Sequence, residues 1–350
     1  MKAYRLTDNQ FDTFVANLVE GQSVVGPVER SDQPGFYRFD RIETSGALVR
    51  QYTTTTLPPK AVFFPPQETV FILQFEADGR PRIEPQWRQE PFVLFGLHPC
   101  DLAAVEALDL AYGFPPAEVR WGENRKKTAI IGLDCLPDDY CFCTSMGTEA
   151  SRAPCDLFFT PIDDSWIAEV HSPIGAMLLS DYSKKPATPA DRRAVEDRLA
   201  QKRSRIRTQL NASAAQFADI LAMGGLTPIW QQTAERCYSC GSCNTTCPTC
   251  FCFSMADELD LDLRGGRRLR RWDSCQLLDF ARVAGGENFR AKRWQRVRHR
   301  WHRKFLYLYN QFGRPFCTGC GRCSRACTAD INIVDVSNEL IAHFQKEAWA

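Results

Sequence analysis

A cysteine motif that occurs twice constrains this chain more than any other feature. The spacing C-x2-C-x2-C-x3-C runs over residues 237–247 and returns over residues 317–327. Three such cysteines on a tight loop bind three irons of one [4Fe–4S] cubane, and the fourth ligates the other cluster in two-cluster ferredoxins. The chain therefore needs a fold that brings together two loops that lie 69 residues apart in the sequence.

The crossed pattern predicts the ligands of two [4Fe–4S] clusters. The first cluster takes Cys237, Cys240, Cys243 and Cys327, and the second takes Cys317, Cys320, Cys323 and Cys247. Glycines at 241, 319 and 321 fit loops whose backbone approaches a cluster closely. Structural zinc pairs two C-x2-C units around one ion, so a repeated triple motif argues against zinc. Cysteines 243, 247 and 250 also have the spacing of a radical-SAM loop, but this match overlaps the better, duplicated pattern.

The hydrophobic pattern predicts an α+β fold, with an N-terminal mixed α/β domain followed by a helical dicluster ferredoxin-like domain. The expected domains are residues 1–185 (α/β), 186–229 (a helical connector) and 230–350 (the dicluster domain, with a basic insertion at 253–316). Within the first domain, apolar periodicity predicts a helix over 8–19 and strands over 69–75, 92–97 and 128–133. A helix around residues 102–108 would make the last two strands parallel neighbours.

Four further cysteines follow those two neighbouring strands. Cys100 comes after the strand at 92–97, while Cys135, Cys141 and Cys143 come after the strand at 128–133. Both groups would emerge at the carboxyl edge of a parallel sheet, where ligand sites collect. The quartet predicts a third [4Fe–4S] cluster, with a zinc ion or unligated thiols as alternatives. We expect His98 to be a surface residue at the strand end rather than a ligand.

The remaining cysteines have no spacing that assigns them. We expect Cys155 to be a buried thiol, and Cys250, Cys252 and Cys275 either to be buried thiols or to line a cluster near the first motif. The chain has no G-x-G-x-x-G after a strand, no Walker A loop and no nucleophile or paired acid–base motif. We therefore predict no catalytic residue, and no flavin or nucleotide on this chain.

A balanced net charge of +1 conceals a basic segment. Residues 264–304 carry 14 Arg and Lys against 3 acidic residues, a local charge of +11. Three interpretations stay open: nucleic-acid contacts aided by tryptophans, counter-charge for anionic clusters, and ion pairs on helices. We favour the last two and expect no nucleic-acid partner. The composition of 276–282 and 296–309 predicts helices within the insertion.

Location follows from cysteine use and from the apolar pattern. The first residues contain no apolar segment of a signal peptide, and no run approaches the ~20 apolar residues that cross a bilayer. Clustered cysteines outside a small secreted scaffold favour a reducing compartment. We expect a cytoplasmic protein without a membrane span.

Several motifs resemble one known family. The segments CPTCFCF (247–253), RWDSC (271–275) and CTGCGRC (317–323) are similar to the beta subunits of cytoplasmic, NAD(P)-linked [NiFe] hydrogenases, the sulfhydrogenases. The A subunit of anaerobic sulfite reductase belongs to the same group. In the first half, GLHPCDLAA (96–104) resembles the family's G-x-R-P-C-D-x-x-A, with His98 in place of the usual arginine. Cys135, the CFCTS segment (141–145) and residues 24–27 and 58–68 extend the likeness over nearly the whole chain.

The resemblance implies an electron-relay subunit without catalytic residues of its own. It would pass electrons between a flavin subunit that handles NAD(P)H and the small subunit of a [NiFe] hydrogenase. In the sulfite reductase relative, the acceptor would instead be a sirohaem subunit. A self-contained iron–sulfur enzyme is the more distant alternative.

Overall fold

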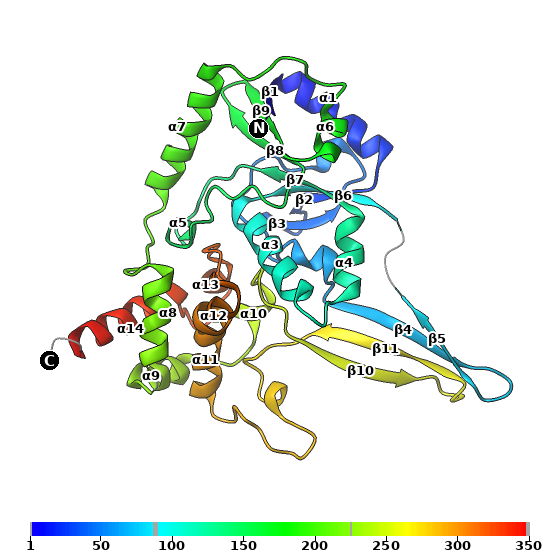
Figure 1. Cartoon of the computed structure of the whole chain (residues 1–350), viewed down its shortest axis with the longest axis vertical. Helices are drawn as coiled ribbons and strands as arrows, with labels where there is room; N and C mark the ends of the chain where they lie inside the picture. Colours follow the sequence, from blue (N-terminus) through cyan, green and yellow to red (C-terminus); the bar gives the residue numbers. More distant parts are fainter. Residues whose placement is uncertain (1, 87–89, 225, 348–350) are drawn as a thin grey trace.

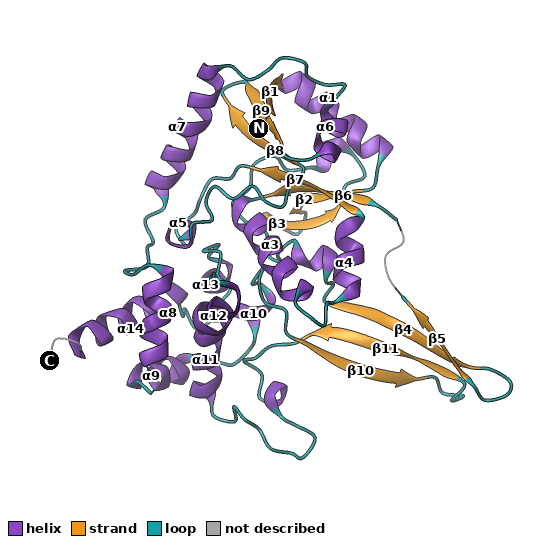
Figure 2. Cartoon of the chain, in the orientation of Figure 1, coloured by secondary structure: helices purple, strands orange, loops and turns teal. Residues whose placement is uncertain are grey.

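The computed structural model describes residues 2–86, 90–224 and 226–347. A seven-stranded sheet with its helices occupies one end of the molecule, and a helical region occupies the other (Figure 1). A second, four-stranded sheet projects to one side between them (Figure 2). An α/β N-terminal part and a helical C-terminal part were predicted, and the structure confirms both.

The large sheet has a parallel centre and antiparallel edges. Its spatial order is β1 (Lys2–Thr7), β9 (Ser165–Val170), β8 (Leu157–Ile162), β7 (Thr128–Leu133), β6 (Phe92–Leu97), β2 (Val24–Arg30) and β3 (Gln33–Arg41). Strands β2, β6, β7 and β8 pair in parallel. The predicted parallel pairing of β6 with β7 is thus confirmed, and their carboxyl ends share one edge of the sheet.

Helices cover both faces of this sheet, which explains the unbroken apolar run of β6. On one face, α1 (Asp8–Gly21) packs Phe11 and Phe14 against a core that includes Phe95. On the other face, α3 (Pro99–Gly113) and α4 (Val119–Lys126) belong to a core that includes Leu94. Because alternate residues of β6 enter different cores, every residue of the strand is buried. Short helices at α2 (Lys60–Phe63), α5 (Cys143–Met146) and α6 (Pro173–Leu179) complete this part.

The four-stranded sheet joins the two halves of the chain. Its order is β10 (Phe253–Leu259), β11 (Gly265–Trp272), β4 (Gln67–Phe75) and β5 (Pro81–Pro85), all antiparallel. We expected a helical domain over residues 230–350, with helices in the insertion at 276–282 and 296–309, but residues 253–272 of the insertion form two paired strands. Its arginines serve as cross-strand partners: Arg268 pairs with Asp257 at 2.6 Å, and Arg270 pairs with Glu68 at 2.5 Å. Such pairs between neighbouring strands stabilise the sheet.

The helical region packs around a second apolar core. Its helices are α8 (Ala214–Met223), α9 (Pro228–Arg236), α11 (Arg293–His302), a π-helical turn (Arg303–Tyr307), α12 (Leu308–Phe312) and α14 (Ile333–Glu347). Trp230, Trp301 and Phe305 lie at the centre of this core. The predicted helix over 296–309 is therefore present, whereas 276–282 contains only a three-residue 3-10 helix (Asp279–Ala281). Helix α7 (Pro189–Arg205) leads from the large sheet to this region (Figure 1).

Candidate iron–sulfur centres

The carboxyl edge of the large sheet holds the first set of cysteines. Cys100 lies in the first turn of α3, directly after β6. Cys135 and Cys141 lie on the loop after β7, and Cys143 is the first residue of α5, which follows this loop. One cavity is lined by all four of the thiols predicted to meet there: Cys100, Cys135, Cys141 and Cys143. We call it the N-terminal thiol cavity. The strand geometry inferred from the sequence therefore brings this quartet together.

The second set combines cysteines from both motifs. Its cavity, the middle thiol cavity, is lined by Cys247, Cys317, Cys320 and Cys323. Cys247 of the first motif therefore lies with three cysteines of the second motif, as the crossed pattern requires of its ligands.

The third set lies deeper in the helical region. Its cavity, the distal thiol cavity, is lined by Cys237, Cys243 and Cys327, together with Cys323. Cys240, the fourth predicted member, is exposed and does not line this cavity, and its Sγ lies 3.3 Å from Ser242 Oγ. Three of the four predicted thiols are thus brought together.

The two motif loops have matching geometry. A short helix follows Gly241 in the first motif (α10, Ser242–Thr245) and Gly321 in the second (α13, Arg322–Arg325). Both glycines have positive φ, 82° and 69° respectively, a conformation that residues with a Cβ rarely adopt. The loop glycines singled out in the sequence therefore shape the turn on which the thiols sit.

The second motif loop also packs directly on the loop of the N-terminal thiol cavity. The Phe142 N–H donates to the Gly319 carbonyl at 2.8 Å. A Cβ at Gly319 would lie 2.5 Å from the Cα of Cys143, which no real side chain tolerates. Backbone contact at this point brings the two cavities together, and Cys320 lines both of them.

Shared cysteines connect all three cavities. Cys320 lines the N-terminal and middle cavities, and Cys323 lines the middle and distal cavities. The thiol sets therefore form one continuous line through the protein, from the edge of the large sheet into the helical region.

Burial keeps most of these thiols protonated when no metal binds them. It raises the pKa of Cys135 and Cys320 to about 11 and that of Cys143 and Cys243 to about 12. A coordinating metal deprotonates a thiol outright, and the resulting negative charge then needs compensation in the protein. The cations around the cavities supply it.

One such cation links the second motif loop to the sheet edge that holds the N-terminal cavity. Arg322, inside the second motif, donates to both carboxylate oxygens of Asp101 at 2.6 and 2.9 Å. The two side chains are 2% and 0% exposed, so this is a fully buried ion pair. Asp101 follows Cys100 in α3, and the pair therefore fixes the motif loop to the sheet edge. On the other side of the N-terminal cavity, Lys202 of α7 pairs with Asp134 at 2.5 Å.

A second cation, Arg300 of α11, lies where several cavities meet. Its side chain lines both the middle and the distal cavity. Burial by itself would lower its pKa, but the surrounding cysteines, Cys243 and Cys323 foremost, hold that pKa well above the ordinary value. Arg300 is therefore a permanent positive charge at the centre of the thiol array. Sequence reasoning recognised a basic segment but could not select this residue.

His98 differs from its prediction. It is 2% exposed rather than at the surface, and its ring stacks on Tyr52 with centroids 3.9 Å apart. The reason is a bulge: Gly96 has a φ of 88° and interrupts the register of β6 with β7, which turns the chain inward. Burial lowers the pKa of His98 to about 3, so the ring is neutral. It lines the N-terminal thiol cavity beside Cys100.

The four unassigned cysteines fall into two groups. Cys155 is buried in the core beneath α3, as predicted for a spare thiol. Cys250, Cys252 and Cys275 line a further cavity next to the middle one. All three were expected to be buried thiols or to line a cluster near the first motif, and the β10–β11 hairpin is what brings Cys275 to the other two.

The thiol sets suit clusters better than single ions. Among the described residues, no three His, Cys, Asp or Glu side chains have the arrangement to hold one metal ion. Each thiolate of a cubane binds a different iron, so its ligands need not converge on one point. Zinc requires that convergence, with ligands at about 2.0–2.3 Å.

Known proteins match both the motif and the whole chain. Residues 236–331 match the family described as a 4Fe-4S dicluster domain. Sulfhydrogenase 2 subunit beta of Pyrococcus furiosus is 34% identical over 346 residues, which cover 97% of this chain and 98% of that protein. No helix in the described residues has the length and apolar character needed to cross a membrane. The thiol array, the dicluster match and the full-length similarity agree: the chain is an iron–sulfur electron-transfer protein and belongs to the family of sulfhydrogenase beta subunits.

Proposed function

We propose that this chain relays single electrons through three [4Fe–4S] clusters. The observation that carries the proposal is the continuous line of three thiol cavities joined by Cys320 and Cys323. The ligands are those of the two crossed motifs, with Cys240 completing the distal set, and the quartet of the N-terminal cavity. Each cluster supplies one-electron transfer when bound.

The protein's own residues set the conditions for that transfer. Arg300 and Lys304 are 4% and 3% exposed and line the middle thiol cavity, where their charge offsets that of an anionic cluster. The second motif loop touches the N-terminal cavity through Gly319, so neighbouring clusters are held close by backbone contacts. A buried, rigid surrounding of this kind keeps solvent away from the clusters, and solvent exposure and hydrogen bonds set their potentials.

We further propose that the relay works inside a hydrogenase complex in the cytoplasm. The relative in Pyrococcus furiosus is named a sulfhydrogenase subunit, which supports partners on both sides of the relay. These would be a flavin subunit that handles NAD(P)H and the small subunit of a [NiFe] hydrogenase. In this arrangement the chain itself carries neither flavin nor catalytic residue.

Iron content and co-purification test the two parts of this proposal. Chain purified without oxygen should lose about four irons when Cys100 and Cys135 are both replaced by serine, because one cluster is removed. Cys155→Ser, a buried thiol outside the three cavities, is the matched control and should keep its iron. An unchanged iron content in the double variant would refute the N-terminal cluster.

A tagged chain should co-purify with flavin- and nickel-containing subunits, whereas a sirohaem subunit in their place would assign it to a sulfite reductase.

A further inference from the structure

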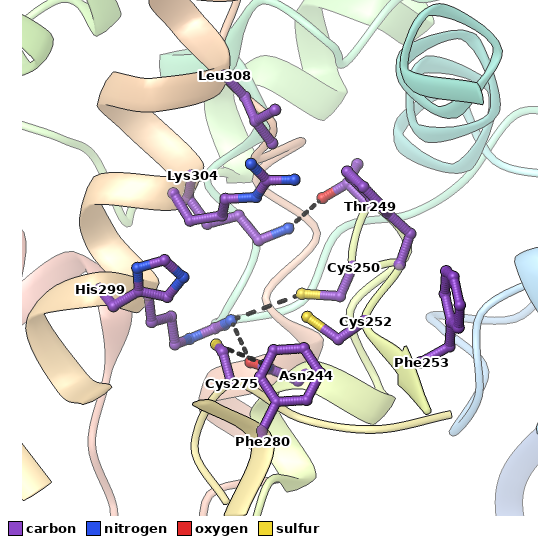
Figure 3. Close-up of a pocket in the computed structure, with 13 residues that line it drawn as sticks. Asn244, Thr249, Cys250, Cys252, Phe253, Cys275, Phe280, His299, Lys304 and Leu308 are labelled. Atoms are coloured by element: carbon purple, nitrogen blue, oxygen red, sulfur yellow. Dashed lines mark hydrogen bonds between the residues drawn. The ribbon is translucent and has the colours of Figure 1, made fainter. Parts of the chain in front are cut away.

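A fourth cavity beside the relay contains three thiols that the ferredoxin pattern does not use. It has a volume of about 280 Å³, and Cys250, Cys252 and Cys275 all face it (Figure 3). The first two precede β10 and the third follows β11, so the hairpin brings them together. The Asp273 N–H donates to the Cys252 carbonyl at 3.0 Å and closes the hairpin at this end. We call this the lateral cavity.

The thiols in this cavity receive hydrogen bonds from side chains. Asn244 Nδ2 donates to Cys275 Sγ at 2.9 Å, and Arg300 Nη1 lies 4.0 Å from Cys250 Sγ (Figure 3). Gln276 Nε2 lies 3.8 Å from Cys275 Sγ. Donors aimed at sulfur are what a protein provides for metal-bound thiolates, since a protonated thiol is only a weak acceptor.

The buried charges around the cavity favour an anionic ligand. Lys60, Arg300 and Lys304 are 3%, 4% and 3% exposed, yet within the described residues none of them pairs with a carboxylate. Lys60 Nζ donates to the Cys250 carbonyl at 2.5 Å, and Lys304 Nζ donates to Thr249 Oγ1 at 2.6 Å, so both bond neutral oxygens. Buried cations are costly unless an opposite charge is near.

These cations lie at the boundary between the middle and the lateral cavity. Arg300 and Lys304 line both cavities, and Lys60 lines neither but contacts Cys250, which lines the lateral one. The Lys60 ammonium instead lies over the Trp272 ring, 4.3 Å from its centroid, and contacts the backbone of Cys250. The groups whose negative charge would favour its ammonium form are the cysteines Cys250, Cys247 and Cys252.

We propose that the lateral cavity holds a fourth iron–sulfur cluster, bound by Cys250, Cys252 and Cys275, with its fourth iron facing the cavity without a cysteine ligand. A cluster rather than one ion fits because these three side chains do not converge as single-ion ligands do. Cys250 lies three residues after Cys247 of the middle cavity. The fourth cluster would therefore lie beside the relay as a branch. This proposal does not depend on which partner subunits the relay has.

Iron analysis of a double variant tests the ligands. The full chain should lose about four irons and the matching sulfide when Cys252 and Cys275 are both replaced by alanine, with Cys155→Ala as the matched control. The EPR signals of the other clusters should persist in the double variant, which shows that the protein still folds. Unchanged iron would overturn the proposal while leaving the three-cluster relay intact. If the unmodified chain has no iron at this site and two of its thiols do not titrate, the cavity contains a disulfide, and this result would also overturn the proposal.

Mild oxidation of the unmodified chain tests the open iron without any substitution. Ferricyanide takes one electron from a [4Fe–4S]²⁺ cluster, and the resulting [4Fe–4S]³⁺ form releases Fe²⁺ to leave [3Fe–4S]⁺ when one iron lacks a thiolate. We expect the EPR signal of one [3Fe–4S]⁺ cluster per chain, present in Cys155→Ala and absent in the Cys252→Ala/Cys275→Ala variant. Absence of that signal in the parent would overturn the open iron. Its persistence in the double variant would assign the open iron to another cavity and overturn the proposal.

Discussion

Replacing Arg300 with glutamine is expected to lower the reduction potentials of the clusters around it. The guanidinium lines the middle, distal and lateral cavities, and its Nη1 lies 4.0 Å from Cys250 Sγ. A positive charge stabilises the reduced, more negative form of a cluster, so its removal makes reduction harder. Glutamine keeps a polar group that reaches toward Asn244, to which Arg300 now donates at 2.9 Å.

The size of the effect follows from Coulomb's law. At about 6 Å from the centre of cluster charge and an effective dielectric constant of about 20, one unit charge contributes about 3 kcal/mol. At about 59 mV per tenfold change for one electron, this corresponds to a potential lower by about 120 mV. Because Arg300 is 4% exposed, solvent screening reduces this value little.

Potentiometric titration followed by EPR measures the shift directly. Arg298→Gln on the same helix is the matched control, because Arg298 lies outside the residues that line the described thiol cavities. We expect its shift to be less than about 30 mV, since a more distant, partly hydrated charge is screened. Equal shifts in both variants, or an upward shift for Arg300→Gln, would refute the placement of Arg300 as the central counter-charge.

Three further substitutions or treatments follow from the same geometry. Gly319→Ala should lower the free energy of unfolding, measured by chemical denaturation, by at least about 1–2 kcal/mol, because φ is 66° and a Cβ would meet Cys143. Gly313→Ala is the control, because its φ is 71° but the space around it is open, so it carries only the conformational cost. Equal losses in the two variants would contradict the contact at Gly319. Arg322→Gln should lower the free energy of unfolding by about 3–5 kcal/mol, because it leaves Asp101 buried and unpaired. Adding Asp101→Asn should restore much of this stability, and a double variant as unstable as Arg322→Gln alone would argue against the pair. Removal of iron by a chelator should speed hydrogen exchange in α11 and the following π-helical turn more than in β6, because Arg300 and Lys304 lose their counter-charge. An equal increase in β6 would contradict this.

The sequence predicted the parts of the fold that depend on local pattern. Phe92–Leu97 and Thr128–Leu133 form parallel neighbours, and their carboxyl ends bring Cys100 and Cys135 to one cavity. The duplicated spacing predicted that Cys247 crosses to the second motif, and the middle cavity contains it. Both results follow from short-range rules, namely strand–helix–strand order and ligand spacing.

Long-range pairing was beyond these rules. The arginine-rich strand at 265–272 lies between β10 and β4. Arg268 of this strand is paired in register with Phe71 of β4, 197 positions earlier in the chain, so the local composition carries no signal of that neighbour. Cys275 follows this strand. Its place near the first motif was expected, but the cavity that it shares with Cys250 and Cys252 depends on this strand pairing. The inward turn of His98 depends on a single bulge at Gly96, which the periodicity of the strand does not reveal.

The basic insertion shows how one composition serves two physical purposes. On the hairpin, Arg267 and Arg271 pair with Glu258 on the neighbouring strand, so their charge is cancelled locally and stabilises strand pairing. On the helical side, Arg300 and Lys304 have no carboxylate partner among the described residues and face sulfur instead. Burying a cation without an opposite charge costs free energy, whereas a buried cation beside an anionic cluster is favourable. The positions of such cations therefore indicate where negatively charged cofactors bind. The same criterion selects the middle cavity, which the motif already predicted, and the lateral cavity, which no motif predicted.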